Sequence, residues 1–241
     1  MESNHSNGLY VIDRYKDLFM NSIIPVKMLK REIDKIPNIN ITDFNGSNIL
    51  YWSMVFCRSD IKIEIMKYII DKGINTDNYD VQRETVLICA CKRGELDIVK
   101  LLVESGSNVN HTDYCNDTAL LWASYLNHIE IVKYLVENGA ADVNHTYRDG
   151  RNSIMWASKQ GNLEIMKYLI NYTTDITRLD IDGYDIYDLA NSKEIRLFLL
   201  DFFEKNKIYL CKFINENLLE NTEKNYDINI TKKMIDYYTK R

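Results

Sequence analysis

The chain repeats one short pattern four times, and this repetition restricts its possible folds more than any other feature of the sequence. Each copy has an acidic residue, a lysine three positions later, and apolar residues around them. The acidic residues are Glu64, Asp97, Glu130 and Glu164, which stand 33 or 34 positions apart. A repeat of this length predicts an array of similar units, each of which buries its apolar face against its neighbours.

Each copy predicts an amphipathic helix that ends in a turn. The apolar residues recur at helical spacing, and the acid and the lysine are i, i+3 neighbours worth about 0.2–0.5 kcal/mol on an exposed helix face. Nine residues after the acid, the first three copies have Gly73, Gly106 and Gly139. Glycine at this place suits the left-handed residue that ends a helix. The fourth copy has Thr173, which predicts a turn of different shape.

A second, shorter helix is predicted before each of these helices. It begins after a residue whose side-chain oxygen can accept a hydrogen bond from a free helix N–H. These capping residues are Asn48, Thr85, Thr118, Asn152 and Asp185. The shorter helix then stops near Gly94, Asn127 or Gly161.

A period near 33 residues, with a turn and two antiparallel helices in each unit, resembles the ankyrin repeat. The resemblance is carried by DYCNDTALLWAS at 113–124, NHIEIVKYL at 127–135, and Gly139 followed by DVN at 142–144. Asp149–Gly150 supplies the hairpin-turn signal of the next copy. The family's Thr-Pro-Leu-His does not occur, since this chain has TVLI at 85–88 and TALL at 118–121. The third copy also carries one extra alanine, at Ala140–Ala141.

The resemblance covers roughly residues 43–204 and implies an all-α ankyrin-repeat solenoid with short hairpin-like fingers and a helical C-terminal tail. In the divergent first repeat we expect Met28, Leu29 and Ile33 to be buried, with Arg31 and Glu32 on a polar outer face. In the tail we expect helices near 208–220 and 230–239. The expected parts are an N-terminal segment and capping repeat at 1–42, repeats at 43–79, 80–112, 113–146 and 147–179, a truncated capping repeat at 180–204, and the tail at 205–241.

Composition excludes several classes of function. No apolar run approaches the roughly 18 residues that a membrane helix needs. The N-terminus MESNHSNGLY does not have the pattern of a secretory signal. A net charge of −5 argues against a nucleic-acid-binding protein, and the five cysteines fit reduced thiols. We therefore expect a protein of the cytoplasm, either of the cell that makes it or of a host cell, that binds neither membranes nor nucleic acid.

The sequence offers no convergent set of catalytic or metal-binding residues. His111 and His145 occupy the same repeat position and could form a pH-sensitive or metal-binding pair. They have no third ligand at metal spacing, so we favour the interpretation that they orient the finger turn or face water. Cys89 and Cys91 point in different directions on a helix, and Cys115 lies near a finger tip. We expect no cofactor, no metal and no enzymatic activity.

The three tryptophans share one position, four residues after the cap of the shorter helix. They are Trp52, Trp122 and Trp156, and Cys89 fills this position in the second repeat. They could form an aromatic ladder on a binding face, or they could fill space between the helices. We favour packing, because a repeated identity at a repeated position marks the shared core.

Binding is expected where the repeats differ, on the concave surface of finger tips and shorter helices. Tyr and Arg, which are enriched in interface hot spots, are frequent there, and the set as a whole predicts a basic face for an acidic or mixed peptide surface. The candidate residues are Phe44, Tyr79, Val81, Gln82, Lys92, Arg93, Tyr114, Tyr125, Leu126, Arg148, Arg151, Lys159, Gln160 and Tyr184.

The resemblance implies a monomeric, non-catalytic module that binds a partner protein. One alternative is an adaptor, or a protein that targets host factors, whose residues 205–241 recruit a second machine. The other alternative is a thiol-based redox sensor or enzyme that uses Cys89, Cys91 or Cys115.

Overall fold

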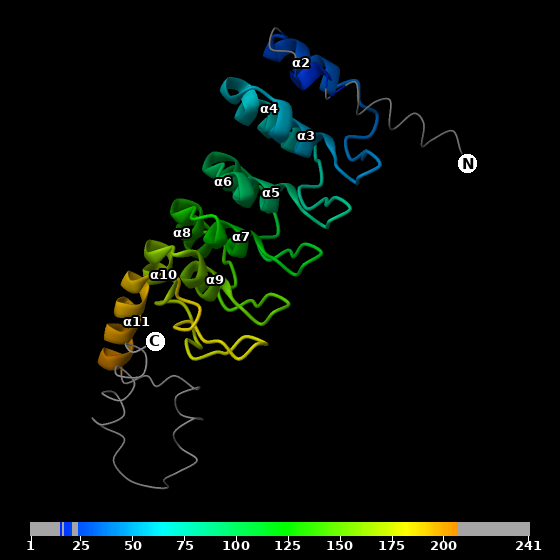
Figure 1. Ribbon diagram of the computed structural model, residues 1–241. Helices are drawn as coiled ribbons and strands as arrows, with labels where there is room; N and C mark the ends of the chain where they lie inside the picture. The colour runs from blue at the N-terminus through cyan, green and yellow to red at the C-terminus, as the bar shows by residue number, and fades with distance from the viewer. Residues whose placement is uncertain (1–14, 16, 21–23, 207–241) are drawn as a thin grey trace, which may run out of the picture. The chain divides into compact units, whose positions relative to one another are not determined.

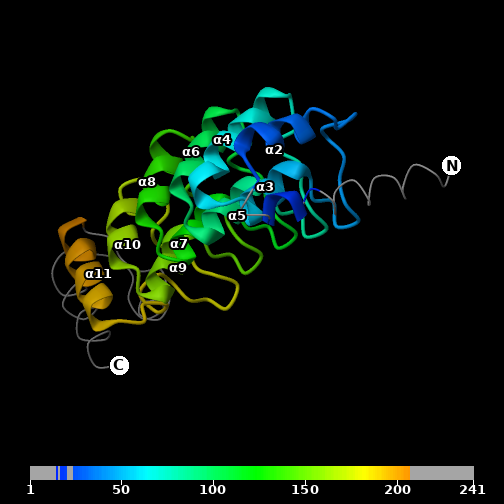
Figure 2. The same ribbon diagram turned by 90° about the horizontal axis from the view of Figure 1, so that it is seen from above.

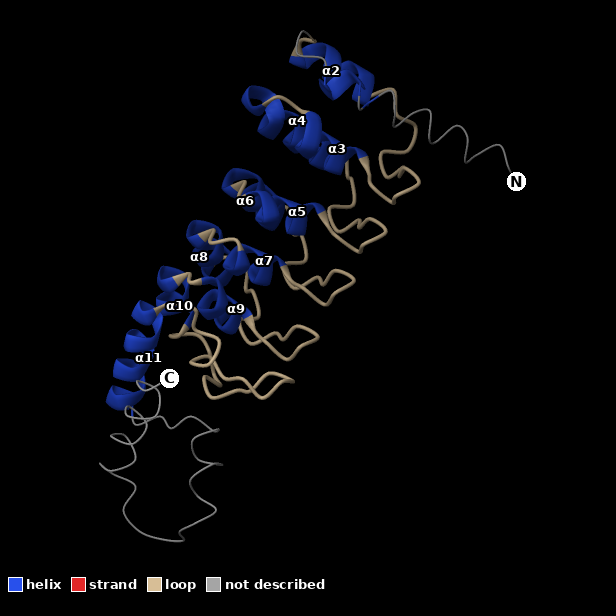
Figure 3. Cartoon of the chain, in the orientation of Figure 1, coloured by secondary structure: helices blue, strands red, loops and turns tan. Residues whose placement is uncertain are grey.

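The computed structural model describes residue 15 and residues 17–20 and 24–206, and this part of the chain is built from helices joined by long loops (Figures 1 and 3). The all-α fold predicted from the repeats is confirmed. The chain divides into two compact units, Met1–Asp142 and Val143–Arg241. None of the described helices combines the length and the apolar character that crossing a bilayer would require.

The first unit stacks three helix pairs behind the helix α2 (Val26–Ile33), and residue 15 and residues 17–20 before it are also helical. The pairs pack in sequence order, shorter helix on shorter helix and longer helix on longer helix (Figure 2). Helix α2 contacts the longer helix of the first pair. The elements are α2 (Val26–Ile33), the pair α3 (Ile49–Phe56) and α4 (Ser59–Asp71), the pair α5 (Val86–Arg93) and α6 (Leu96–Glu104), and the pair α7 (Ala119–Tyr125) and α8 (Ile129–Glu137).

The second unit contains one helix pair and a terminal helix. α9 (Ser153–Gln160) packs against α10 (Leu163–Leu169), and α11 (Lys193–Asn206) follows after a long loop. The expected tail helices near 208–220 and 230–239 lie outside the described residues.

Side-chain caps start four of the five shorter helices as predicted. Asn48, Thr85, Thr118 and Asn152 each accept a hydrogen bond from the backbone N–H three residues later. Asp185 makes the same kind of bond, to Asp188 N at 2.8 Å, but the residues after it form a turn. The helix expected there is therefore a wrong prediction. Directly after this turn, the backbone N–H of Asn191 donates to the carbonyl of Ser158 in α9 at 3.4 Å.

The turns after the longer helices follow the glycine pattern in two copies. Gly73 and Gly106 are left-handed, with φ of 81° and 86°. The prediction was wrong for Gly139: the left-handed residue is Ala140, with φ of 51°, because the extra alanine moves the turn one position on. Gly139 is needed for close packing instead, since a Cβ there would lie 2.8 Å from the carbonyl oxygen of Leu135. Thr173 ends its helix by donating its hydroxyl to Leu169 O at 3.0 Å.

The expected acid–lysine pairs form in two copies. Lys133 and Lys167 lie 3.0 and 3.1 Å from the acids three positions before them, Glu130 and Glu164. Glu64 instead pairs with Lys30 of α2 at 2.6 Å, so it ties the capping helix to the first full repeat. In the second copy, Lys100 lies over the ring of Tyr134, 5.9 Å from its centroid.

The capping helix α2 buries a narrower stripe than the sequence predicts. Leu29 and Ile33 are buried, but Met28 is 56% exposed, so its predicted burial was wrong. The buried side chains Leu29 and Ile33 form a single i, i+4 row of the helix, and Met28 lies outside this row.

Removing one of these caps tests how much the capping hydrogen bond stabilises the repeat. The change Thr118→Ala leaves the N–H of Leu121 without its side-chain acceptor, and should lower the free energy of unfolding by about 1 kcal/mol. Thr118→Ser keeps the hydroxyl and should cost less than half of that. Urea unfolding of the full chain, followed by far-ultraviolet circular dichroism, measures both. Equal losses in the two variants would show that the methyl group of Thr118, rather than the cap, stabilises the repeat.

Candidate functional site

The loops between helix pairs form short fingers, each built around one residue position. In the first unit the fingers are residues 43–47, 80–84 and 113–117, and each begins with an aspartate. The carboxylate of Asp80 accepts the N–H groups of Gln82 at 2.8 Å and Glu84 at 2.9 Å. Asp43 and Asp113 make the same two bonds in their own fingers. Isolated antiparallel bridges close the base of each finger, which confirms the hairpin-like geometry predicted from the sequence.

Backbone hydrogen bonds tie each finger of the first unit to the next one. Val81 N donates to Asn45 O, and Tyr114 N donates to Gln82 O, both at 2.8 Å. The same register occurs in the second unit, where Ile181 N donates to Asp149 O at 2.9 Å. Within each unit, neighbouring fingers therefore lie in the same register, and the three fingers of the first unit form a row with their equivalent residues side by side.

The tip residue directly after each aspartate is apolar and exposed. In the first unit Phe44 is 70% exposed, Val81 60% and Tyr114 61%, as the sequence predicts for a contact surface. In the second unit Ile181 is 72% exposed. Ile181 was not among the predicted residues, although its position after Asp180 matches that of Phe44 and could have identified it.

The other predicted contact residues divide by exposure. Those that are exposed are Tyr79, Gln82, Arg93, Leu126, Arg148 and Tyr184. Those that are half-buried are Lys92, Tyr125, Lys159 and Gln160.

Arg151 is buried within the second unit and does not line an exposed surface. Its guanidinium lies 2.9 Å from a carboxylate oxygen of Asp149 and 2.8 Å from one of Asp180. These bonds join the finger of residues 147–151 to the finger of residues 180–184. Arg151 thus acts as a brace between two fingers, a role that the sequence reading did not anticipate.

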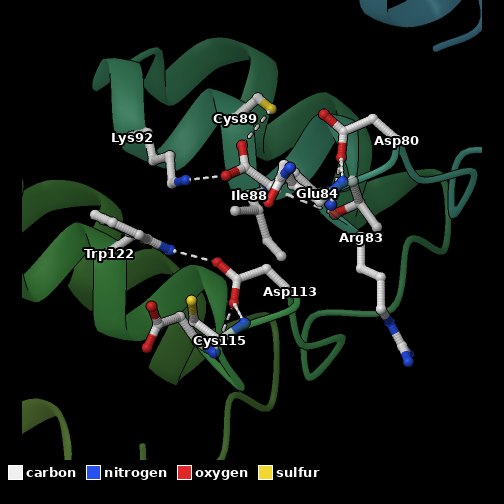
Figure 4. Close-up of polar contacts among 12 residues, drawn as sticks. Asp80, Arg83, Glu84, Ile88, Cys89, Lys92, Asp113, Cys115 and Trp122 are labelled. Atoms are coloured by element: carbon white, nitrogen blue, oxygen red, sulfur yellow. Dashed lines mark hydrogen bonds and ion pairs between the residues drawn. The ribbon is translucent and has the colours of Figure 1, made fainter. Parts of the chain in front are cut away.

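The tryptophans connect a finger to the helix that follows it. The indole N–H groups of Trp52 and Trp122 donate to Asp43 and Asp113 respectively, both at 3.1 Å. In the second repeat, Cys89 occupies the same position and its thiol lies 3.4 Å from Glu84 Oε2 (Figure 4). The recurring contact with the finger favours the packing reading over the aromatic ladder.

A continuous polar network joins the second and third repeats of the first unit (Figure 4). Lys92 of α5 forms an ion pair with Glu84 of its own finger. The same ammonium lies 3.9 Å from the ring centroid of Trp122 in α7, and that indole bonds to Asp113. Cation–π attraction in this partly buried setting contributes about 1 kcal/mol, so the network fixes one repeat on the next.

The predicted basic face is largely neutralised inside the chain. Lys92 is paired with Glu84, and Arg93 lies 2.7 Å from Glu95. Arg151 is paired in the second unit. The first unit nevertheless presents an exposed cation at Arg83, a residue that the predicted set did not contain. Across the described part of the chain, no carboxylate lies within ion-pair distance of Arg83, and its guanidinium lies over the Tyr79 ring, 5.6 Å from the centroid.

Arg83 also has an unusual backbone. Its φ is 60°, in the left-handed region that L residues other than Asn and Asp seldom occupy. The equivalent finger residues are Gly46, Asn116, Gly150 and Gly183, all residue types that tolerate this conformation. Comparing the fingers position by position would have identified Arg83 from the sequence.

His111 supports the Arg83 finger. Its Nε2 lies 3.0 Å from Arg83 O, so this nitrogen donates, and its ring stacks on Tyr79 with 5.6 Å between centroids. This arrangement supports the expectation that His111 orients the turn.

Asp113, Cys115 and Asp117 are the types of residue that bind metal ions, and their ligand atoms lie within 4.8 Å of one another. However, Asp113 already accepts the N–H groups of Cys115 and Asp117 and of the Trp122 indole. Asp43 and Asp80 make the same backbone bonds in fingers that have no cysteine. The grouping therefore follows from the shape of the finger and does not indicate a metal centre.

The buried thiols are poorly suited to redox chemistry. Burial raises the pKa of Cys57 to about 11 and raises the pKa of Cys89 and of Cys91 even more strongly. At neutral pH, a thiol with a pKa of about 11 is ionised to under about one part in a thousand, and the thiolate is the reactive form. Cys115 is exposed, and Cys211 lies outside the described residues.

Replacing Arg83 by glycine should stabilise the fold. Arg83→Gly removes the left-handed strain of a non-glycine residue and should raise the free energy of unfolding by up to about 1 kcal/mol. Urea unfolding of the full chain measures this change, with Arg93→Gly as the control. Arg93 lies within α5, where glycine should cost about 1 kcal/mol. A loss of stability in Arg83→Gly would show that the Arg83 side chain contributes more to the fold than its backbone strain costs.

Thiol labelling should distinguish Cys115 from the buried cysteines. In a Cys211→Ser chain at neutral pH, we expect one thiol to react rapidly with an aromatic disulfide reagent, and Cys115→Ser should abolish this fast phase. Cys57, Cys89 and Cys91 should react only after unfolding, because their thiols are buried and protonated. A fast phase that persists in the Cys115→Ser, Cys211→Ser double variant would revive the thiol-sensor alternative.

The comparisons with known proteins agree with this architecture. The family model described as ankyrin repeats (3 copies) matches residues 24–113 and 109–180, which together span more than half of the chain. The search of curated proteins found no match. Ankyrin repeats generally act as protein–protein interaction modules and are typically non-catalytic. The chain therefore belongs to the ankyrin repeat family.

Proposed function

We propose that this protein is a non-catalytic binding module whose first unit holds a partner protein on its fingers and shorter helices. The observation that carries the proposal is the row of exposed apolar tips formed by Phe44, Val81 and Tyr114, each more than half exposed. Covering large apolar side chains that the fold leaves in water lowers the free energy, so these side chains favour binding of a partner. Contiguous exposed apolar groups in a folded domain mark interaction sites.

The tips are suited to binding because the fold holds them in place. Each finger is fixed internally by its aspartate, and neighbouring fingers are joined by the backbone hydrogen bonds from Val81 N to Asn45 O and from Tyr114 N to Gln82 O. A surface that is already ordered loses little conformational entropy when a partner binds, so more of the contact energy contributes to affinity.

Residues at the ends of the shorter helices form the border of this surface, and of these Lys92 and Tyr125 are half-buried while Arg93 and Leu126 are exposed. Tyr125 and Leu126 lie at the end of α7, beside Lys92 and Arg93 at the end of α5. Polar rims around an apolar centre are typical of protein interfaces. In the second unit, Arg148, Lys159, Gln160 and Tyr184 remain proposed contacts on its own fingers and shorter helix.

The alternatives have less support. The thiol-sensor reading loses two of its three cysteines, Cys89 and Cys91, to burial. The adaptor reading, and with it the targeting of host factors, rests on residues 205–241, of which only Lys205 and Asn206 are described. Protein binding by the first unit is the function that the described residues favour.

Affinity capture with quantitative mass spectrometry tests the proposal. The intact chain is compared with a variant that carries Phe44→Ser, Val81→Ser and Tyr114→Ser. The matched control carries Met28→Ser, Tyr172→Ser and Leu197→Ser, which also replace exposed apolar side chains, 56%, 44% and 54% exposed respectively. Circular dichroism and a melting curve establish that both variants fold.

We expect captured partners to fall at least tenfold with the tip variant and to be retained by the control, since a few apolar anchors dominate interface energy. Partners that bind the tip variant as well as the intact chain would rule out the finger row as the binding surface.

A further inference from the structure

We propose that the finger row of the first unit recognises an extended peptide segment of the partner, one that has an apolar side chain at every third position and a carboxylate for Arg83. This inference rests on the proposed function and specifies the class of its ligand. Three observations lead to it: the presence of Arg83 in the second finger, the hydrogen bonding of the finger backbone, and the spacing of the fingers.

Arg83 occupies a position that its sister fingers give to glycine or asparagine. A non-glycine residue in the left-handed region is strained, and such strain persists only where the surrounding structure enforces it. His111 and Tyr79 supply this support, since His111 donates to Arg83 O and Tyr79 lies beneath the guanidinium. The strained backbone therefore presents a positioned cation on the middle finger of the row, which points to recognition of an anion.

The charge of Arg83 has no internal counterpart in the structure as described. Lys92 and Arg93, the basic residues of the adjacent helix α5, are paired with Glu84 and Glu95. Figure 4 shows the Arg83 side chain pointing away from the network formed by Glu84, Lys92 and Trp122. A planar guanidinium matches a carboxylate with two parallel hydrogen bonds, so an aspartate or glutamate of the partner is the complementary group.

The finger backbone cannot pair with an added strand. In the second finger, the N–H groups of residues 81–84 are all bonded within the chain, to Asn45 O, to Asp80 Oδ1 twice, and to Asp80 O. In the third finger, the N–H groups of residues 114–117 are bonded in the same way, the first of them to Gln82 O. Addition of a β-strand needs free backbone donors, so the partner must be recognised through side chains.

The spacing of the fingers favours a three-residue period in the ligand. Packed helices lie about 8–10 Å apart, and the fingers follow the stacking of α3, α5 and α7. A polyproline II segment has three residues per turn and rises about 3.1 Å per residue, so every third side chain faces the same way at intervals of about 9 Å. A β-strand repeats its face about every 7 Å, which does not match. An α-helix presents the same face again after two turns, about 11 Å along its axis. Each such interval takes about seven residues, more than twice the three residues of a polyproline II segment.

Selection from a phage-displayed library of random 12-residue peptides against the intact full chain tests this inference. We expect enriched peptides to carry apolar residues at i, i+3 and i+6 with an aspartate or glutamate among them. Synthetic versions should bind the tip variant of Phe44, Val81 and Tyr114 more than tenfold more weakly. They should bind Arg83→Gly about five- to tenfold more weakly, although that variant is expected to be at least as stable as the native chain. The Lys133→Ala variant, which removes a cation that pairs with Glu130 on α8, serves as the matched loss of an internally paired cation and should bind these peptides as tightly as the native chain.

A charge reversal separates a specific contact from a general electrostatic effect. Selection against Arg83→Glu should enrich lysine or arginine where selection against the native chain enriches acidic residues. Reversing an internally paired cation of the longer helix α8, Lys133→Glu, should leave the enriched pattern unchanged.

The outcomes distinguish this inference from the proposed function. Peptides that lose binding to the tip variant but show a helical or alternating apolar pattern, or that bind Arg83→Gly as tightly as the native chain, would overturn the inference and leave the finger surface standing. Failure to enrich any peptide would also overturn it, because a linear segment would then be insufficient. Peptides that bind the tip variant unchanged would overturn both proposals.

Discussion

Burial of apolar side chains between successive helix pairs is the interaction on which the rest of the structure depends. The position two residues after the repeated acid is completely buried in every copy, as Met66, Val99, Val132 and Met166. Two helices of seven to thirteen residues cannot enclose such residues alone, because short isolated helices are marginal in water. Within the first unit, each helix pair gains stability by packing on its neighbour, and the fingers acquire fixed positions as a consequence.

The fingers convert this stacking into an ordered surface. The aspartate that opens a finger bonds to two backbone N–H groups, and in two repeats it also accepts the indole N–H of the following helix. The finger is thereby attached to its own helix, and the backbone bond from Val81 to Asn45 attaches it to its neighbour. With the backbone groups used internally, the exposed tip side chains remain as the variable part of each repeat. Identity between repeats thus maintains the fold, and difference between repeats is left for recognition.

Charged side chains serve two different purposes in this arrangement. Lys92 and Arg151 are held against carboxylates and aromatic rings, where they join one repeat to the next. Removing such a residue would leave a partly buried carboxylate without its partner, which costs more than an exposed ion pair contributes. Arg83 has no carboxylate within ion-pair distance among the described residues, and its backbone conformation costs free energy. The residues next to them in the sequence do not show which of Lys92, Arg151 and Arg83 is paired with a carboxylate, because all three are basic residues in or near a finger.

The sequence by itself determined the repeat, the fold class, the four helix caps and the exposure of Phe44, Val81 and Tyr114. These features depend on residues within about one helical turn of each other, or on a periodicity that can be read along the chain. Only the tertiary structure decided that Arg151 is a buried brace, that Glu64 pairs with Lys30, and that Arg83 lies over Tyr79 with His111 behind it. Most of these contacts join residues of adjacent repeats, 28–34 positions apart in the examples of His111, Arg151 and Glu64. At such separations a charged residue has several possible partners, and the packing of one repeat on the next determines which partner it meets.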